Sequence, residues 1–115
     1  MTFDPEPYAA GIRRRNEEER ARIERRLLEA RAEANRLSSE LRRSDPSIKR
    51  VMLFGSVARG NPFHEKFDID LALDGGDLHA ALDITEASSF KVDLVSLTLL
   101  PEGMRRAVRE RGIEL

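Results

Sequence analysis

Hydrophobic positions in the first half of the chain recur at a helical spacing. Between positions 23 and 41 the steps are 4, 3, 4, 3 and 4 residues, which is typical of a helix that buries one stripe. The stripe consists of Ile23, Leu27, Ala30, Ala34, Leu37 and Leu41. Pro46 disfavours helical backbone in the residue before it, so the helix should end near Ser44. The pattern predicts one helix from about Tyr8 to Arg43, polar on all sides from Arg13 to Arg20.

This stripe has two interpretations. In the first, its second half packs on the sheet of the same domain; in the second, it is a coiled-coil or partner-binding seam. A helix of about 36 residues is ~54 Å long, whereas a compact domain of this size has a radius of gyration near ~13 Å. We therefore expect the helix to overhang, with residues 1–22 as a helical extension and residues 23–115 as the globular domain.

After Pro46 the chain changes to short apolar segments separated by turns. The segments SIKRVMLF, FDIDLAL and FKVDLVSL predict strands within residues 47–54, 67–73 and 90–97. Each has the length and the β-branched or alternating content of a strand rather than of a helix.

Two further helices are expected between and after these strands. Asp77 suits the N-cap of a helix over residues 78–87, and Pro101 suits the first residue of a helix that ends near Arg111, before Gly112. Residues 113–115 form a short edge strand or a tail. Strands that alternate with helices predict the α/β (or α+β) class around a small sheet.

Composition narrows the functional classes. Charged residues make up 36% of the 115 residues, but 20 basic and 21 acidic side chains leave a net charge of -1, which argues against duplex-DNA binding. The chain has no Cys, which excludes disulfides, thiolate catalysis and zinc held by Cys. No apolar run approaches the roughly 20 residues of a membrane span, and the acidic start MTFDPEPY lacks a signal-peptide core. We expect a cytoplasmic protein without membrane contact.

Two acidic residues interrupt an apolar strand. Asp68 and Asp70 are two positions apart, so both side chains point to the same face of the strand. Their backbones are only about 7 Å apart, so the charges repel and one carboxyl tends to stay protonated. A bound Mg²⁺, which prefers oxygen ligands, would remove this repulsion. The alternative is a solvated strand face with ordinary surface carboxylates.

A third acid, Asp93, occupies the middle of the apolar segment KVDLV, where Asp is disfavoured. If this strand lies beside that of Asp68 and Asp70, the three carboxylates share one pocket. Three carboxylates can hold two Mg²⁺ ions, the arrangement used for in-line displacement at phosphorus. We therefore predict a metal site formed by these three residues.

Gly55 and Ser56 follow the first strand, where a short helix ending near Arg59 is expected to begin. Such a turn exposes backbone N–H groups, which commonly hold phosphate, and glycine lets a ligand approach closely. Ser56 adds a hydroxyl donor, and Arg59 is within reach of the same anion. A plain turn is the alternative, but its place shortly before the acidic strand favours phosphate binding.

The segment LFGSVARGNPFHEKFDIDLAL resembles the signature of the DNA polymerase β-type nucleotidyltransferase superfamily, and in particular of its minimal nucleotidyltransferase (MNT) domains. The family pattern reads G-S-x-A-R-G, a spacer and then S-D-I-D-L, and a later strand supplies a third acid at the position of Asp93. The resemblance covers residues 48–115. It implies a small mixed sheet of the nucleotidyltransferase type, with helices packed on one side.

The resemblance also assigns roles to the candidate residues. Gly55, Ser56 and Arg59 would bind the nucleotide phosphates. Asp68 and Asp70 would ligate two Mg²⁺ ions. Asp93 would ligate the catalytic ion and help to activate the acceptor hydroxyl.

Two features depart from the family pattern. Phe67 stands where the family usually has Ser, and the spacer between Gly60 and Asp68 is slightly longer than expected. Neither change removes a predicted ligand.

The function implied by the resemblance is Mg²⁺-dependent transfer of a nucleoside monophosphate, AMP from ATP, to a hydroxyl acceptor. Because the chain is short, a partner would present the acceptor, and in the minimal family this partner is commonly a HEPN toxin. The long N-terminal helix would contact such a partner or a second copy of the chain. The alternative is a non-catalytic antitoxin or assembly subunit that acts by binding alone, which Phe67 favours.

Several other residues carry side chains that can take part in binding or catalysis. They are His64, Glu65, His79, Phe63, Phe67 and the basic pairs Lys49-Arg50 and Arg105-Arg106. We expect the histidines and the glutamate to be polar surface groups, the phenylalanines to pack in the core or a loop, and the basic pairs to be solvated.

Overall fold

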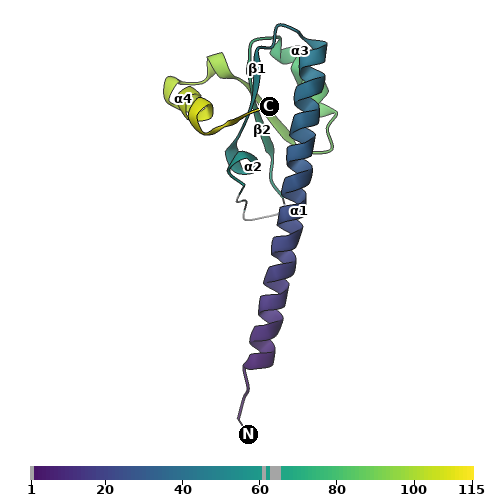
Figure 1. Ribbon diagram of the computed structural model, residues 1–115, viewed down its shortest axis with the longest axis vertical. Helices are drawn as coiled ribbons and strands as arrows, with labels where there is room; N and C mark the ends of the chain where they lie inside the picture. Colours follow the sequence, from purple (N-terminus) through teal and green to yellow (C-terminus); the bar gives the residue numbers. More distant parts are fainter. Residues whose placement is uncertain (1, 61, 63–65) are drawn as a thin grey trace.

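The computed structural model describes residues 2–60, 62 and 66–115, and these form a mixed α/β fold (Figure 1). The elements are helix α1 (Glu6–Ser44), strand β1 (Arg50–Phe54), helix α2 (Gly55–Arg59), strand β2 (Ile69–Asp74), helix α3 (Leu78–Glu86), strand β3 (Val92–Ser96), the 3-10 turn η1 (Leu97–Leu99), helix α4 (Glu102–Arg111) and strand β4 (Ile113–Glu114). The predicted class, with a mixed sheet and a long N-terminal helix, is confirmed. In the described ranges, no helix is long and apolar enough to cross a bilayer.

Helix α1 has 39 residues and extends slightly beyond both predicted ends. Pro7 lies in its first turn, where a missing N–H leaves no hydrogen bond unmade. The Asp4 carboxylate accepts a hydrogen bond from the N–H of Glu6. Asp45 leaves the helix in an extended conformation, as the steric restriction before Pro46 requires.

The second half of α1 packs on the sheet, as the first interpretation of the stripe predicted. Its buried residues are Leu27, Ala30, Ala34, Leu37, Ser38 and Leu41. The apolar ones share one core cluster with Val51 and Leu53 of β1 and Leu71 of β2. Ala30 and Ala34 are fully buried, and their small size lets the helix approach the strands closely.

The first half of α1 projects away from the rest of the fold (Figure 1). The molecule measures 72 × 30 × 17 Å, and its radius of gyration of 18.7 Å exceeds that of a compact chain of this length. Residues from Arg13 to Arg20 are exposed. The predicted overhang is therefore present in the structure.

The sheet has the strand order β3-β2-β1-β4. Strand β1 pairs antiparallel with both β2 and β4, and β2 pairs parallel with β3. A parallel pair needs a crossover connection, and α3 supplies it. The Asp77 carboxylate caps α3 by accepting from the N–H groups of His79 and Ala80, as predicted.

Helices cover both faces of the sheet, so the prediction that they lie on one side is wrong. Met52 of β1 and Ala72 of β2 face away from α1 and form a second cluster with Val108 of α4 and Leu97. Figure 1 shows α4 and α1 on opposite sides of the strands. The physical reason is that β1 and β2 are apolar on both faces, and the second face also needs a cover.

Leu37→Ala is expected to lower the free energy of unfolding by about 3 kcal/mol, because the side chain is fully buried between α1 and the sheet. Leu28→Ala is the matched control on the same helix, since Leu28 is 67% exposed, and it should change stability by less than about 0.5 kcal/mol. Urea unfolding measures both values. Equal losses in the two variants would contradict the packing described here.

Candidate functional site

The parallel pairing of β2 with β3 places two of the predicted acids side by side. Asp70 and Asp93 are direct partners in the strand register. Alternation along β2 puts Asp70 on the same face as Ala72, the face that α4 covers. Asp68 lies just before β2, close enough for its charge to act on Asp70. The structure thus brings the three predicted carboxylates together where β2 and β3 begin.

Asp70 is the most perturbed member of this group, and its pKa is raised to about 6. Burial is the largest cause, because it disfavours the charged form. The negative charges of Asp93 and Asp68, and a hydrogen bond with Asp93, raise the pKa further, while the positive charge of Arg59 lowers it. Asp70 therefore gives up its proton less readily than an ordinary aspartate side chain.

Gly55 lies against Asp70 so closely that a side chain does not fit. Its φ is +75°, in the left-handed region that favours glycine. A Cβ atom at this position would lie 2.1 Å from Oδ2 of Asp70. The predicted phosphate-binding turn and the acidic group are consequently parts of one site.

Helix α2 carries the other predicted phosphate contacts, with Ser56 partly buried and Arg59 exposed. Arg31 of α1 holds the far end of this helix: its guanidinium donates to the carbonyl of Val57 at 3.1 and 3.2 Å and to that of Ala58 at 3.4 Å. A cation is favourable at a helix C-terminus, where carbonyls lack partners. Sequence patterns did not single out Arg31, because it is one of many arginines in α1.

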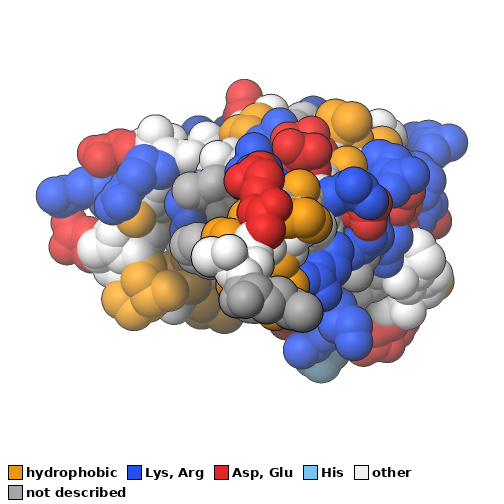
Figure 2. All heavy atoms as spheres, turned by 90° about the horizontal axis from the view of Figure 1, so that it is seen from below, with side chains coloured by type: hydrophobic (Ala, Val, Ile, Leu, Met, Phe, Trp, Pro, Cys, Tyr) orange, Lys and Arg blue, Asp and Glu red, His pale blue; other side chains and the backbone are white. Residues whose placement is uncertain are grey.

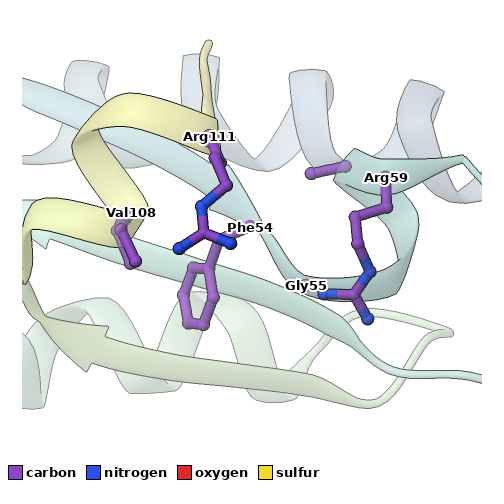
Figure 3. A pocket seen from close by; sticks show the side chains of 8 residues that line it. Phe54, Gly55, Arg59, Val108 and Arg111 are labelled. Carbon is purple, nitrogen blue, oxygen red and sulfur yellow. The ribbon is translucent and has the colours of Figure 1, made fainter. Parts of the chain in front are cut away.

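A cavity of about 370 Å³ lies beside Gly55, between α2 and α4 (Figure 3). Phe54 and Val108 give it an apolar lining. Arg59 reaches it from α2 and Arg111 from α4, so it carries positive charge on both sides. Arg111 is a second residue that the sequence patterns missed. The cavity suits a ligand that joins an anionic part to an apolar one.

The acidic group fits a divalent cation by its donor chemistry. Asp68, Asp70 and Asp93 supply only carboxylate oxygens, the ligands that Mg²⁺ prefers, and their mutual repulsion is what such a cation would relieve. The three side chains do not form a complete metal site as they stand. In the part of the chain that the structure describes, no three Asp, Glu, His or Cys side chains are arranged so that they could hold a metal ion. Asp68 instead has Nζ of Lys91 3.6 Å from its Oδ2.

The remaining polar, aromatic and basic candidates from the sequence do not belong to this acidic group. Three of them, Phe63, His64 and Glu65, fall outside the described residues. Phe67 packs against the main core cluster, and His79 is exposed on α3. Among the basic pairs, Arg50 donates hydrogen bonds to the Asp74 carboxylate, and Arg106 pairs with an acid of its own helix.

Comparisons with known proteins identify a family and a solved structure that are similar to this chain. The family described as "Nucleotidyltransferase domain" matches residues 34–112, which include β1, α2, β2 and β3. A chain from a solved structure described as "Crystal structure of the toxin-antitoxin with AMP-PNP" is similar, with 26% sequence identity and a TM-score of 0.57. The similarity covers 69% of this chain and 69% of that one. A comparison with curated proteins found no significant match.

Gly55→Ala is expected to lower the free energy of unfolding by about 2 kcal/mol or more, because the methyl group meets Asp70 and the backbone is left-handed. Gly103→Ala in α4 is the control, since a Cβ there meets nothing within 4 Å. That change should leave stability unchanged or raise it by up to about 1 kcal/mol. Thermal or urea unfolding distinguishes the two, and similar effects of both substitutions would contradict the close approach.

Asp70→Asn is expected to stabilise the metal-free protein at pH 7–8 and to have little effect below about pH 4. Because the folded-state pKa of Asp70 is raised from 3.8 to about 6, the folded state binds more protons than the unfolded state between these values. Stability therefore falls as pH rises through this window, and the amide removes the loss. We expect a gain of about 1 kcal/mol, allowing for the exposed part of the side chain.

Urea unfolding at pH 7–8 and below about pH 4, in the presence of a chelator, measures how much the substitution changes the free energy of unfolding at each pH. Asp83→Asn on α3 serves as the control, because Asp83 is exposed and lies outside the acidic group. A gain for Asp70→Asn that is the same at both pH values would show that charge repulsion is not its cause.

Proposed function

Because this chain belongs to the nucleotidyltransferase domain family, we propose that it moves AMP from ATP to a hydroxyl group of another molecule. The observation that carries this proposal is the environment of Asp70, which lies against Gly55, is the register partner of Asp93 and is acted on by the charge of Asp68, all within the segment that matches the family. The similar solved structure contains AMP-PNP, an adenine nucleotide, which supports ATP as the donor.

The nucleotide lies in the cavity between α2 and α4. Its phosphates contact the backbone N–H groups and the hydroxyl of the Gly55-Ser56 turn, while Arg59 and Arg111 balance their charge. The apolar lining, which includes Phe54, is suited to the less polar part of the nucleotide. This placement directs the α-phosphate toward the acidic group, because Gly55 is in contact with Asp70.

Asp68 and Asp70 would hold two Mg²⁺ ions, and Asp93 would be a ligand of the ion nearest the acceptor. When bound, these ions neutralise phosphate charge and acidify the acceptor hydroxyl. The acceptor oxygen forms a bond to the α-phosphorus while the bond from that phosphorus to the bridging oxygen breaks, and pyrophosphate leaves. Asp93, exposed on the outer strand β3, takes the hydroxyl proton.

The acceptor is a hydroxyl of a partner protein, a toxin of the HEPN type, and the chain acts as its antitoxin. The similar structure is that of a toxin-antitoxin, which supports this pairing. The exposure of Asp93 at the outer strand supports an acceptor as large as a protein. In this assignment residues 23–115 are the transferase domain, and residues 1–22 are an extension of it.

A non-catalytic antitoxin or assembly subunit is the second candidate. Two observations favour it: Lys91 pairs with Asp68, so that this acid has a cation other than a metal, and Phe67 replaces the Ser of the family pattern. In that case the chain would act by binding its partner, and the acidic group would bind no metal.

Isothermal titration of ATP with and without Mg²⁺ tests the first candidate. We expect binding that requires Mg²⁺ and that weakens at least about tenfold in Asp68→Asn/Asp70→Asn, because two ligands are lost. Asp83→Asn should bind as the unchanged protein does. Parallel incubations of the chain and its partner with ATP labelled at the α- or the γ-phosphate should leave only the α label on the partner.

Two results would overturn the proposal. Binding of ATP that is independent of Mg²⁺ and unaffected by the double substitution would place the nucleotide elsewhere. Absence of any ATP binding would leave the non-catalytic subunit as the function.

A further inference from the structure

The projecting half of α1 is a surface that the proposed function leaves unused. No side chain in the described stretch from residue 6 to residue 26 is buried, and the stretch is ~31 Å long at 1.5 Å per residue. Tyr8 and Ile12 are exposed large hydrophobic residues within it. Figure 2, which looks at the whole molecule from below, shows basic, acidic and hydrophobic side chains interspersed on the surface seen from that side.

The charges of this stretch are arranged in two adjacent blocks. Residues 13–15 are three arginines, residues 17–19 are three glutamates, and Asn16 separates them. Within one helix residues of the two blocks that are four apart lie on neighbouring turns, while Arg13 pairs with Glu6, whose Oε1 is 2.7 Å from its Nη2. Between two parallel copies like charges would lie level, whereas in two antiparallel copies centred on Asn16 residues 13–15 of each copy lie level with residues 17–19 of the other. Arg13, Arg15, Glu17 and Glu19 lie within about 100° of Asn16 around the helix and carry this complementarity, whereas Arg14 and Glu18 point to the opposite side.

Three apolar residues of the overhang share one face of the helix with Asn16. Ala9, Ile12, Asn16 and Ile23 fall within about 60° of one another around the helix, at 100° per residue. In an antiparallel pair centred on Asn16, Ala9 of each copy lies level with Ile23 of the other, and the two Asn16 residues meet at the centre. A polar residue at one seam position commonly fixes the register of paired helices.

We propose that the projecting halves of α1 from two copies of this chain pair antiparallel, centred on Asn16, and that this surface makes the protein a dimer. The pairing is independent of the proposed function, since it uses none of the residues of the acidic group or the cavity.

Sedimentation equilibrium at low and high salt tests the pairing with two charge-reversal variants. One is Arg13→Glu/Arg14→Glu/Arg15→Glu, whose overhang has two acidic blocks; the other is Glu17→Arg/Glu18→Arg/Glu19→Arg, whose overhang has two basic blocks. The unchanged chain should dimerise, more tightly at low salt. Each variant alone should dimerise at least about tenfold more weakly, because like charges meet.

An equimolar mixture of the two variants should recover the dimer, as should the single chain that carries all six substitutions. This recovery separates contacts between copies from contacts within one helix, because neither variant regains its own pairs on mixing. Circular dichroism confirms that each variant keeps its helix. A chain that stays monomeric at every concentration, variants that dimerise as well as the unchanged chain, or a mixture without recovery would each overturn the proposal.

Discussion

The register between β2 and β3 is the constraint on which the site depends. It sets Asp70 opposite Asp93, although the two carboxyls repel each other. The register is fixed by the other face of the same two strands, which is apolar and packs in the core. Leu71 pairs with Leu94 in that register, and both pack toward the core shared with α1. A shift by one residue would turn these side chains to the wrong face. Core packing therefore holds the acids together against their repulsion.

Local patterns were sufficient for most of the fold and for naming the acids. The stripe of α1, the apolar strands and the Asp77 cap each depend on residues close in sequence, so periodicity and capping rules reach them. The three acids stand out because they break the local pattern instead of following it. Asp93 conflicts with the apolar segment around it, and so do Asp68 and Asp70, which are two positions apart in another predicted strand. Such conflicts often mark functional sites.

Contacts between segments that are distant in the sequence could not be predicted from such local patterns. Nothing local to α4 says which face of the sheet it covers, although Met52 and Ala72, apolar on the side away from α1, were a signal that a second cover was needed. The contacts of Arg31 with α2 and of Lys91 with Asp68 depend on the tertiary fold. Phe67 was expected to pack rather than stack on a base, and it does pack against the core.

The guanidinium of Arg31 gives α1 a polar contact with α2 in addition to its packing in the core. It connects the long helix directly to the carbonyls at the end of α2, one turn away from Gly55. The position of α2, and with it the glycine turn against Asp70, therefore depends on α1 as well as on the strands.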